Sequence, residues 1–242
     1  MRICLISDTH LAHLKHPIDV PECDLLIHSG DALSGGSEDE MILFSAWFGS
    51  LKAKKKVFVA GNHDWIFQKS PDEARRLLPE GVIYLEDDLT EVDGLKIYGA
   101  PWQPEFYEWA FNLPRGHLLA KKWAEIPAGI DILVTHGPPM GILDWSNFSR
   151  EHVGCADLRR EISRVKPKVH VFGHIHGSYG TAVHGGTLFV NAATCDEGYR
   201  PSHAPIVIEM EPGKDPVVVP GPGIGVPVKK VFPLRNAQRP LF

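Results

Sequence analysis

Aspartate, asparagine and histidine residues recur in five short clusters along the chain, and each cluster follows an apolar run. The clusters are Asp8-Thr9-His10, Gly30-Asp31, Gly61-Asn62-His63-Asp64, Thr135-His136-Gly137 and Gly173-His174-Ile175-His176. Carboxylate and amide oxygens and imidazole nitrogens are donor atoms for borderline divalent metals such as manganese, iron, cobalt and zinc. The residue types therefore indicate metal chemistry.

Each cluster alone has an ordinary structural explanation. Asp31 after Gly30 could cap a helix or close a turn, and Asn62 after Gly61 could be a simple turn. A chance arrangement would need all five strand ends to carry ligand-type residues independently. We therefore interpret the clusters together, as one centre assembled from distant parts of the chain.

The apolar runs before the clusters predict the strands that position them. They are short and lack polar alternation, as expected of strands covered on both faces. The runs are Ile3–Ile6, Leu25–Ile27, Val57–Ala60, Ile132–Val134 and Val169–Phe172. Ligands of open α/β sheets bind at the carboxyl ends of the strands, so the clusters meet at one edge if these runs share a sheet.

Helix signals lie between some of these runs. Ser37-Glu38-Asp39-Glu40 has the form of a capping box and predicts a helix through Leu51. Ser70-Pro71 predicts a short helix that ends near Leu78, and a third helix is expected over 156–165, before Pro167. Further strands are expected at Leu95–Tyr98, Thr187–Val190 and Ile206–Glu209. The pattern predicts a layered α/β sandwich with one mixed sheet or a pair of sheets.

Composition excludes several classes of protein. The 242 residues suit one α/β domain or two small ones, and no apolar run reaches the length of a transmembrane helix. The net charge of −5 argues against a long nucleic-acid surface, and the four scattered cysteines indicate reduced thiols. The first apolar stretch is too short for a secretory signal, so we expect a cytoplasmic protein that inserts into no membrane.

Two segments have unusual composition. Pro101–Gly116 carries five aromatic residues among prolines, and we leave open whether it is a packed lid or part of a substrate mouth. Residues 211–242 hold seven prolines and four glycines, which excludes a regular helix. This tail is expected either to lie along the domain or to reach a partner subunit.

The ordered series Asp-x-His, Gly-Asp, Gly-Asn-His-Asp, His-Gly and Gly-His-x-His resembles the calcineurin-like metallophosphoesterase superfamily, and it spans residues 8–176. Shorter motifs resemble its metallophosphoesterase-domain (MPPED, 239-type brain protein) subfamily, which is similar to class III cyclic-nucleotide phosphodiesterases. These motifs are Pro101–Pro104, Asn112–Gly116, Thr135–Pro139, Val153–Cys155, Val171–His176 and Asn191–Cys195. The resemblance implies an α/β/β/α sandwich of two mixed sheets flanked by helices over residues 1–210, followed by the 211–242 tail.

The resemblance also implies a two-metal site. One ion would be held by Asp8, His10, Asp31 and His176, and the other by Asp31, Asn62, His136 and His174. Some animal members carry glycine at the position of His174, and this chain keeps the histidine, so we expect a complete site. His63 would contact the phosphate beside Asn62 and protonate the leaving oxygen, with Asp64 orienting its ring. A hydrogen bond of His63 within its own turn is the structural alternative.

The implied function is hydrolysis of a small phosphodiester, such as a cyclic nucleotide, by metal-bound hydroxide. Manganese is the first choice of metal, with iron, cobalt or zinc as alternatives. Two divalent ions, two carboxylates and a hydroxide leave net positive charge, which suits a phosphate ester. The alternatives are a phosphomonoesterase or protein phosphatase with the same metals, and a low-activity scaffold that binds nucleotide. A homodimer is left open.

Overall fold

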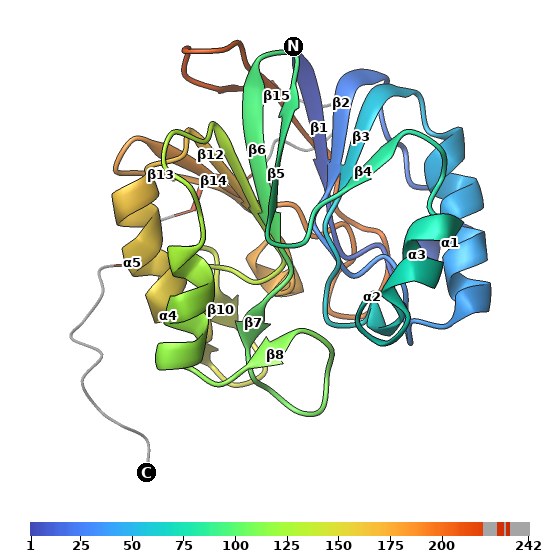
Figure 1. The fold of residues 1–242 in the computed structure, drawn as a ribbon, viewed down its shortest axis with the longest axis horizontal. Helices are drawn as coiled ribbons and strands as arrows, with labels where there is room; N and C mark the ends of the chain where they lie inside the picture. Colours follow the sequence, from blue (N-terminus) through green and yellow to red (C-terminus); the bar gives the residue numbers. More distant parts are fainter. Residues whose placement is uncertain (220–226, 230, 233–242) are drawn as a thin grey trace.

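Two six-stranded mixed sheets pack face to face, and helices cover their outer faces, in the computed structural model of the chain (Figure 1). The structure describes residues 1–219, 227–229 and 231–232. The predicted α/β/β/α sandwich is confirmed.

The first sheet is built from the N-terminal third of the chain and from two late strands. Its order is β16 (Val217–Val219), β15 (Ile206–Glu209), β1 (Arg2–Ile6), β2 (Cys23–His28), β3 (Ala53–Phe58) and β4 (Val82–Tyr84). Strands β1 to β4 are parallel, whereas β15 and β16 pair antiparallel at one side. The carboxyl ends of β1, β2 and β3 therefore share one edge.

The second sheet repeats this plan with the middle of the chain. Its order is β13 (Gly180–His184), β14 (Thr187–Asn191), β12 (Val169–Phe172), β9 (Ile132–Thr135), β6 (Leu95–Ala100) and β5 (Asp88–Val92). The four central strands are parallel, and β13 and β5 are antiparallel edges. The five strands that precede the polar clusters are thus divided between two sheets, three in the first and two in the second.

The predicted helices form where their signals stand. Helix α1 (Glu38–Ser50) starts with the capping box, in which Ser37 and Glu40 each accept from the other's backbone N–H. Helix α3 (Pro71–Leu77) has proline at its start, and α5 (Ala156–Val165) ends just before Pro167. The remaining helices were not predicted: α2 (Trp65–Lys69), α4 (His117–Ala124), η1 (Ala12–Leu14) and η2 (His176–Ser178). None of the described helices combines the length and the apolar character that a membrane span requires.

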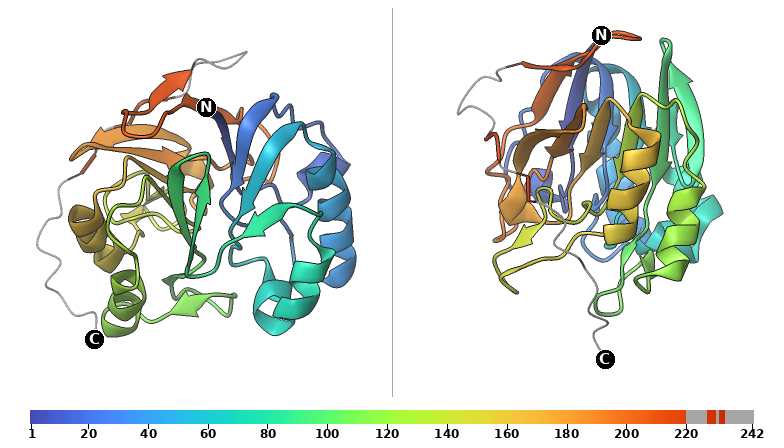
Figure 2. Two further views of the ribbon diagram at one scale, coloured as in Figure 1. Left: turned by 45° about the horizontal axis from the view of Figure 1, so that its top comes forward. Right: turned by 90° about the vertical axis from the view of Figure 1, so that its left-hand side faces the viewer.

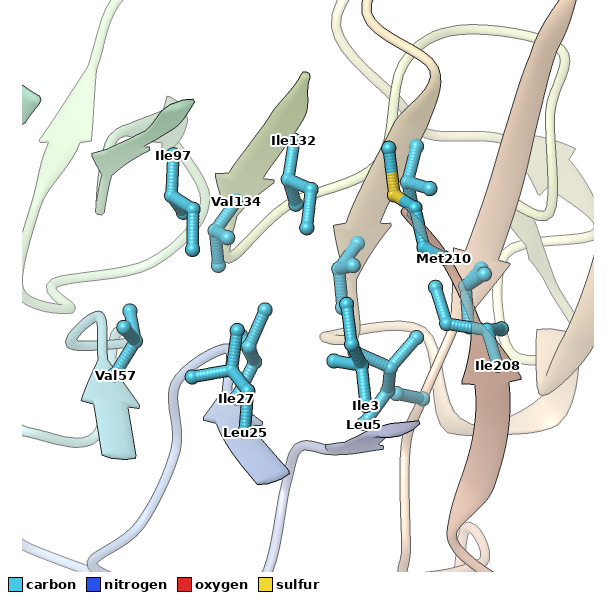
Figure 3. Close-up of a cluster of buried hydrophobic side chains, with 14 of the residues drawn as sticks. Ile3, Leu5, Leu25, Ile27, Val57, Ile97, Ile132, Val134, Ile208 and Met210 are labelled. Carbon is cyan, nitrogen blue, oxygen red and sulfur yellow. The ribbon is translucent and has the colours of Figure 1, made fainter. Parts of the chain in front are cut away.

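Apolar side chains fill three layers. Figure 3 shows the central layer, where Val57 and Ile27 of the first sheet face Ile97 and Val134 of the second. Alternate residues point outward: Cys4 and Ile6 of β1 lie in a second cluster, with side chains of α1, and a third cluster lies between the second sheet and helices α4 and α5. Both faces of the central strands are therefore buried, which explains their unbroken apolar sequences.

Short pairings extend the two halves. Strands β7 (Gln103–Pro104) and β8 (Asn112–Leu113) lie in the aromatic segment, and β10 (Trp145–Ser146) pairs with β11 (Glu151–His152) in a hairpin. In the tail, β16 joins the first sheet beside β15, as the two views of Figure 2 help to follow. Val228 forms a bridge to Thr181 of β13. Residues 220–226, 230 and 233–242 of the predicted tail lie outside the described residues, and the domain boundary after residue 210 stays a prediction.

Candidate metal centre

The five polar clusters meet where the carboxyl ends of the two sheets adjoin. In Figure 1 this edge lies away from the N-terminus, which marks the start of β1. The first sheet contributes residues that follow β1, β2 and β3, and the second contributes residues that follow β9 and β12. The centre is therefore shared by both halves of the molecule rather than formed at the edge of a single sheet.

One group of ligand-type atoms comes from Asp8, His10 and His176, and these atoms lie within 4.8 Å of one another. Nε2 of His176 is 3.3 Å from Oδ1 of Asp8 and 3.3 Å from Nε2 of His10. This group joins the end of β1 to the turn after β12.

A second group comes from Asp31, His136 and His174, again with ligand atoms within 4.8 Å of one another. Nε2 of His136 is 3.3 Å from Oδ2 of Asp31 and 2.9 Å from Oδ1 of Asn62. The same Asp31 oxygen is 3.8 Å from Nε2 of His10, which belongs to the first group. Asp31 therefore lies between the two groups, as a bridging carboxylate must.

Backbone carbonyls orient three of these imidazoles. The Nδ1 atoms of His10, His136 and His176 lie 3.1, 3.0 and 2.9 Å from the carbonyl oxygens of Leu33, Ser29 and Asp196. A carbonyl can only accept, so each Nδ1 carries the hydrogen and the neutral ring presents the Nε2 lone pair to the centre. This is the usual support of a metal-binding histidine.

These lone pairs and oxygens face one another. In their neutral forms His10 and His176 place two lone pairs 3.3 Å apart, and His136 points a lone pair at the oxygens of Asp31 and Asn62. Acceptors that converge in a buried space repel unless a cation or proton lies among them. The residues therefore fit a pair of divalent cations in both donor type and orientation.

Without metal, protons lie among these converging acceptors. Burial opposes charge, but the hydrogen bond to Asp8 raises the pKa of His176 to about 9, and the charge of Asp31 raises that of His136 to about 9. Burial also opposes ionisation of Asp8 and Asp31, yet the same two contacts hold the pKa values of these carboxyls below their usual range. Burial lowers the pKa of His10 to about 4. The two aspartates therefore remain anionic and available to cations.

The ligand turns have unusual backbone conformations. Asp8, His10, Asp31 and His174 adopt the left-handed region, with φ of 51°, 42°, 55° and 67°. Two glycines allow the turns to approach closely: a Cβ at Gly173 would overlap the Asp8 carboxylate, and a Cβ at Gly61 would overlap that of Asp31. Such strained conformations cluster at functional sites.

Two further buried histidines support the ligand turns in matching ways. Nε2 of His28 lies 2.9 Å from Oγ1 of Thr9, which stands between two ligands, and the Gly30 N–H donates to His28 Nδ1. In the second sheet, Nε2 of His170 lies 2.8 Å from Oγ1 of Thr135, whose hydroxyl donates to a backbone carbonyl. Each histidine thus donates to a threonine beside one of the turns that carry ligand-type residues.

The predicted role of Asp64 as the partner of His63 is wrong. The Asp64 carboxylate accepts from the backbone N–H groups of Gly61 (2.7 Å) and Leu33 (2.9 Å), and burial raises its pKa to about 7. The His63 ring is oriented instead by Ser34, whose carbonyl oxygen lies 2.6 Å from Nδ1. Asp64 therefore ties together the loops that follow β2 and β3.

A cleft of about 510 Å³ opens beside the ligand groups. Its lining consists of Asp31, Asn62, His63, Phe106, Ser146, Asn147, Phe148, His174, Ile175, His176, Glu197 and Tyr199. The sequence did not single out Asn147, Phe148, Glu197 or Tyr199. The strand-end pattern could have identified Glu197 and Tyr199, which follow β14, whereas Asn147 and Phe148 lie in the β10–β11 hairpin, which carries no such pattern.

Comparisons with known proteins agree with this geometry. Residues 1–178 match the family model of the "Calcineurin-like phosphoesterase". "Metallophosphoesterase domain-containing protein 1" of human and of mouse is 42% identical over 232 residues, covering 86% of this chain and 71% of the relative. The "UPF0046 protein C25E10.12" of Caenorhabditis elegans is 40% identical over 234 residues, covering 88% and 83%.

A solved structure shares the fold. The crystal structure of TT1561 of Thermus thermophilus covers 78% of this chain and 88% of its own, with a TM-score of 0.50 and 15% identity. At this identity the likeness concerns the arrangement of helices and strands alone.

Proposed function

The chain belongs to the calcineurin-like phosphoesterase family, and from this premise we propose that it hydrolyses small phosphodiesters, such as cyclic nucleotides, with two divalent metal ions. The observation that carries the proposal is that Asp31 lies between two groups of ligand-type side chains, beside an open cleft. Two adjacent metal ions are a common device for displacement at phosphorus.

Each ion would have four ligands. Asp8, His10, Asp31 and His176 would hold one, and Asp31, Asn62, His136 and His174 the other. When bound, the ions supply Lewis acidity that activates water and neutralises phosphoryl oxygens. The mixed nitrogen and oxygen donors suit manganese, iron, cobalt or zinc, and manganese is our first choice among them.

The chain itself fixes the ligands before substrate arrives. The backbone N–H of His174 donates to both oxygens of Asp8, at 2.9 and 3.0 Å, and the N–H of His63 donates to Oδ1 of Asp31 at 2.8 Å. Each carboxylate is thus held by the turn that carries another residue of the centre. Fixed donors need no rearrangement during the reaction, which lowers its barrier.

His63 would serve the leaving group. Its ring lines the cleft, and Ser34 occupies its Nδ1, so Nε2 is the nitrogen left for substrate. In its protonated imidazolium form, with the Nδ1 hydrogen on Ser34, the His63 ring would carry a second proton at Nε2. As the bond from phosphorus to the leaving oxygen breaks, that oxygen would take the Nε2 proton and leave a neutral ring, and water would add its hydroxyl to phosphorus. The products are a monoester and an alcohol, and the proton lost by water restores His63. General acid catalysis by histidine contributes roughly 10²–10⁴-fold.

The walls of the cleft favour a diester over a monoester. No lysine or arginine is found among the residues that line it in the described part of the chain, and Glu197 adds a carboxylate. The second negative charge of a monoester dianion would therefore find no lysine or arginine in the cleft walls. Phe106 and Phe148 provide apolar surface that suits the organic group of a diester, and aromatic stacking on a base contributes about 1–3 kcal/mol.

A substrate panel tests the proposal. Protein loaded separately with manganese, iron, cobalt or zinc is assayed on cyclic nucleotides, bis(p-nitrophenyl) phosphate and p-nitrophenyl phosphate. We expect kcat/KM for diesters to exceed that for the monoester at least 10-fold, roughly 1.4 kcal/mol of discrimination. A reversed preference would assign a phosphomonoesterase. Tight AMP or GMP binding without any turnover would assign a binding scaffold.

The cytoplasmic location and the homodimer are separate expectations. Cell fractionation of tagged full-length protein tests the first, and light scattering at several protein concentrations tests the second.

A further inference from the structure

We propose that Trp109 is a positioning residue for His63, holding its imidazole where Nδ1 donates to Ser34 and Nε2 serves the leaving oxygen. The proposal rests on the proposed function for the role of His63. It also gives a purpose to the aromatic segment, for which the sequence left two interpretations open.

The contact between the two rings is direct. Their centroids are 4.0 Å apart with an angle of 35° between the planes. His10 meets the same imidazole edge-on, with centroids 4.8 Å apart and planes at 84°. His63 is only half-buried, and a single hydrogen bond at Nδ1 leaves the ring free to pivot. The indole supplies the second constraint.

Trp109 is itself fixed to the turn that carries His63. The next residue, Ala110, donates its N–H to the carbonyl of Asn62 at 3.1 Å. Phe111 donates its N–H to Oε1 of Gln68 at 2.7 Å, and both Ala110 and Phe111 are buried. These two hydrogen bonds therefore fix the position of the Trp109 indole relative to Asn62, the residue that precedes His63 in sequence.

The same segment contacts the other half of the centre. Phe106 meets His174 edge-on, with ring centroids 5.3 Å apart, and it lines the cleft. The side chain of Asn112 donates to the carbonyls of Phe106 and Tyr107 at 3.0 Å each, and it thereby closes the loop that runs from these two residues to Asn112. The segment therefore spans the centre from His174 to His63, with Phe106 at the substrate mouth and Trp109 against the acid.

Proton transfer depends steeply on position. The heavy atoms must come within about 2.6–3.2 Å, and a displacement of about 1 Å can lower the rate by roughly 10²-fold. The loss matters only when the leaving oxygen needs a proton. A ribose alkoxide needs one, whereas p-nitrophenolate leaves as a stable anion.

The test compares Trp109→Ala with Trp109→Phe on 2′,3′-cyclic AMP and bis(p-nitrophenyl) phosphate, at equal metal content. We expect Trp109→Ala to lower kcat on the cyclic nucleotide roughly 10–100-fold, with KM little changed. On the nitrophenyl diester the loss should stay below about 3-fold, and Trp109→Phe should recover most of the activity. Tyr107→Ala is the matched control, because Tyr107 is 74% exposed and meets only Phe106 among the aromatic rings of the described residues.

A double-mutant comparison separates positioning from general damage. In the His63→Ala background, Trp109→Ala should cause no further loss on the cyclic nucleotide, since the residue it positions is gone. Multiplicative losses, or equal losses on the two substrates, would overturn the proposal. If Trp109→Ala fails to fold, Trp109→Leu takes its place, because leucine keeps apolar bulk without a flat ring.

A second readout does not depend on activity. In zinc-loaded protein labelled with ¹⁵N-histidine, the Nδ1 proton of His63, held by Ser34, should exchange slowly with water. This resonance should be lost in Trp109→Ala and kept in Tyr107→Ala; its survival in Trp109→Ala would refute the positioning role. Wild-type protein inert on every ester would refute the proposed function alone, because the resonance still decides the role of Trp109.

Discussion

The proposed ligands of the centre are strained individually and supported mutually. A left-handed conformation at a residue other than glycine costs of order 1–3 kcal/mol, and four of the proposed ligands adopt it. The N–H of Asp8 donates to the carbonyl of Gly30 at 2.9 Å, and that of His10 donates to the carbonyl of Asp31 at 3.1 Å. Each strained turn is therefore hydrogen-bonded to another ligand-bearing turn, and the set holds together as a unit.

Asp31, assigned to metal binding, and His63, assigned to proton transfer, should respond differently to substitution in metal content and turnover. Asp31→Ala should remove both metal ions, because its carboxylate lies between the two groups and would be a ligand of both ions. His63→Ala should keep both ions and lower turnover by roughly 10²–10⁴-fold. Metal analysis together with kcat on the cyclic nucleotide makes the comparison. Equal metal loss in both variants would contradict the assigned roles.

The glycine before His174 should be as necessary as a ligand. In Gly173→Ala the new methyl group would overlap the Asp8 carboxylate and the Ser7 side chain, both buried, so the first ligand group must shift. We expect metal affinity to fall roughly 10–100-fold, as it does when a supporting residue of a ligand is lost. Gly35→Ala is the control, because its Cβ would make only ordinary contacts. Titration with zinc and a competing chelator measures both, and equal affinities would refute the steric argument.

At the scale of elements, local signals account for much of the fold. Short apolar runs that end in polar residues marked the central strands, and the capping box at Ser37 marked the start of α1. Strand β3 begins four residues before its predicted start at Val57, because its lysines, with Lys54 and Lys55 exposed, hide the pattern of a buried strand. Helix α4 follows Gly116, which has φ of 91° and provides no side-chain cap, so no sequence signal announces it.

The parts of the site that were not predicted from the sequence depend on contacts between residues that are distant in the chain. Strand ends predicted the ligand-type residues, because parallel strands deliver their carboxyl ends to one edge. The partner of His63 could not be predicted, because Ser34 enters through its carbonyl, which every residue possesses. Trp109 was noticed only as part of an aromatic segment, since its packing on His63 follows from the hydrogen bond of Ala110 to Asn62.

The β10–β11 hairpin should depend on Asp144. This buried carboxylate accepts from the N–H groups of Gly141 (2.9 Å) and Gly154 (3.0 Å) and from His152 (2.7 Å). Asp144→Ala leaves two buried donors without a partner and should lower the free energy of unfolding by roughly 2–4 kcal/mol.

Asp144→Ala should also raise KM several-fold, because Phe148 of the hairpin lines the cleft, with kcat and metal content unchanged. Asp144→Asn keeps an acceptor and should do less harm. Denaturant unfolding and steady-state kinetics measure these effects, and an unchanged KM in Asp144→Ala would remove the link to substrate.

At the scale of the molecule, the metal ions would join the two halves. Each proposed ligand set draws residues from both sheets, so the ions bind the assembled fold and not the separated strands. A ligand at 100 times its Kd stabilises the native state by about 2.7 kcal/mol. For a chain of this size, removal of each ion should lower Tm by roughly 5–10 °C. Thermal unfolding with and without a chelator measures the shift. The Tm of the Asp31→Ala variant should not change when the chelator is added. The same shift in Tm in that variant would show that the stabilisation by metal does not come from this centre.

The buried supporting histidines should make the metal-free fold sensitive to acid. Burial lowers the pKa of His170 from 6.5 to about 3, so below pH 6.5 the unfolded chain binds a proton that the native state refuses. The free energy of unfolding should then fall by about 1.4 kcal/mol per pH unit for this residue as pH drops from 6.5 towards 5. His136 and His176, with native pKa values of about 9, are already protonated in the native state, so they add a slope of opposite sign near pH 6.5 that fades towards pH 5 and is the same with and without the His170 ring. Replacing the ring by His170→Leu removes the titration while keeping an apolar neighbour for Phe172 and Phe189. Urea unfolding in the presence of chelator measures the free energy of unfolding of both proteins at several pH values. The two curves of this free energy against pH should converge on acidification, because the slope of the variant is smaller by about 1.4 kcal/mol per pH unit. Parallel curves would mean that His170 is protonated inside the fold, and that the matched pair of histidines does not stay neutral behind the ligand turns.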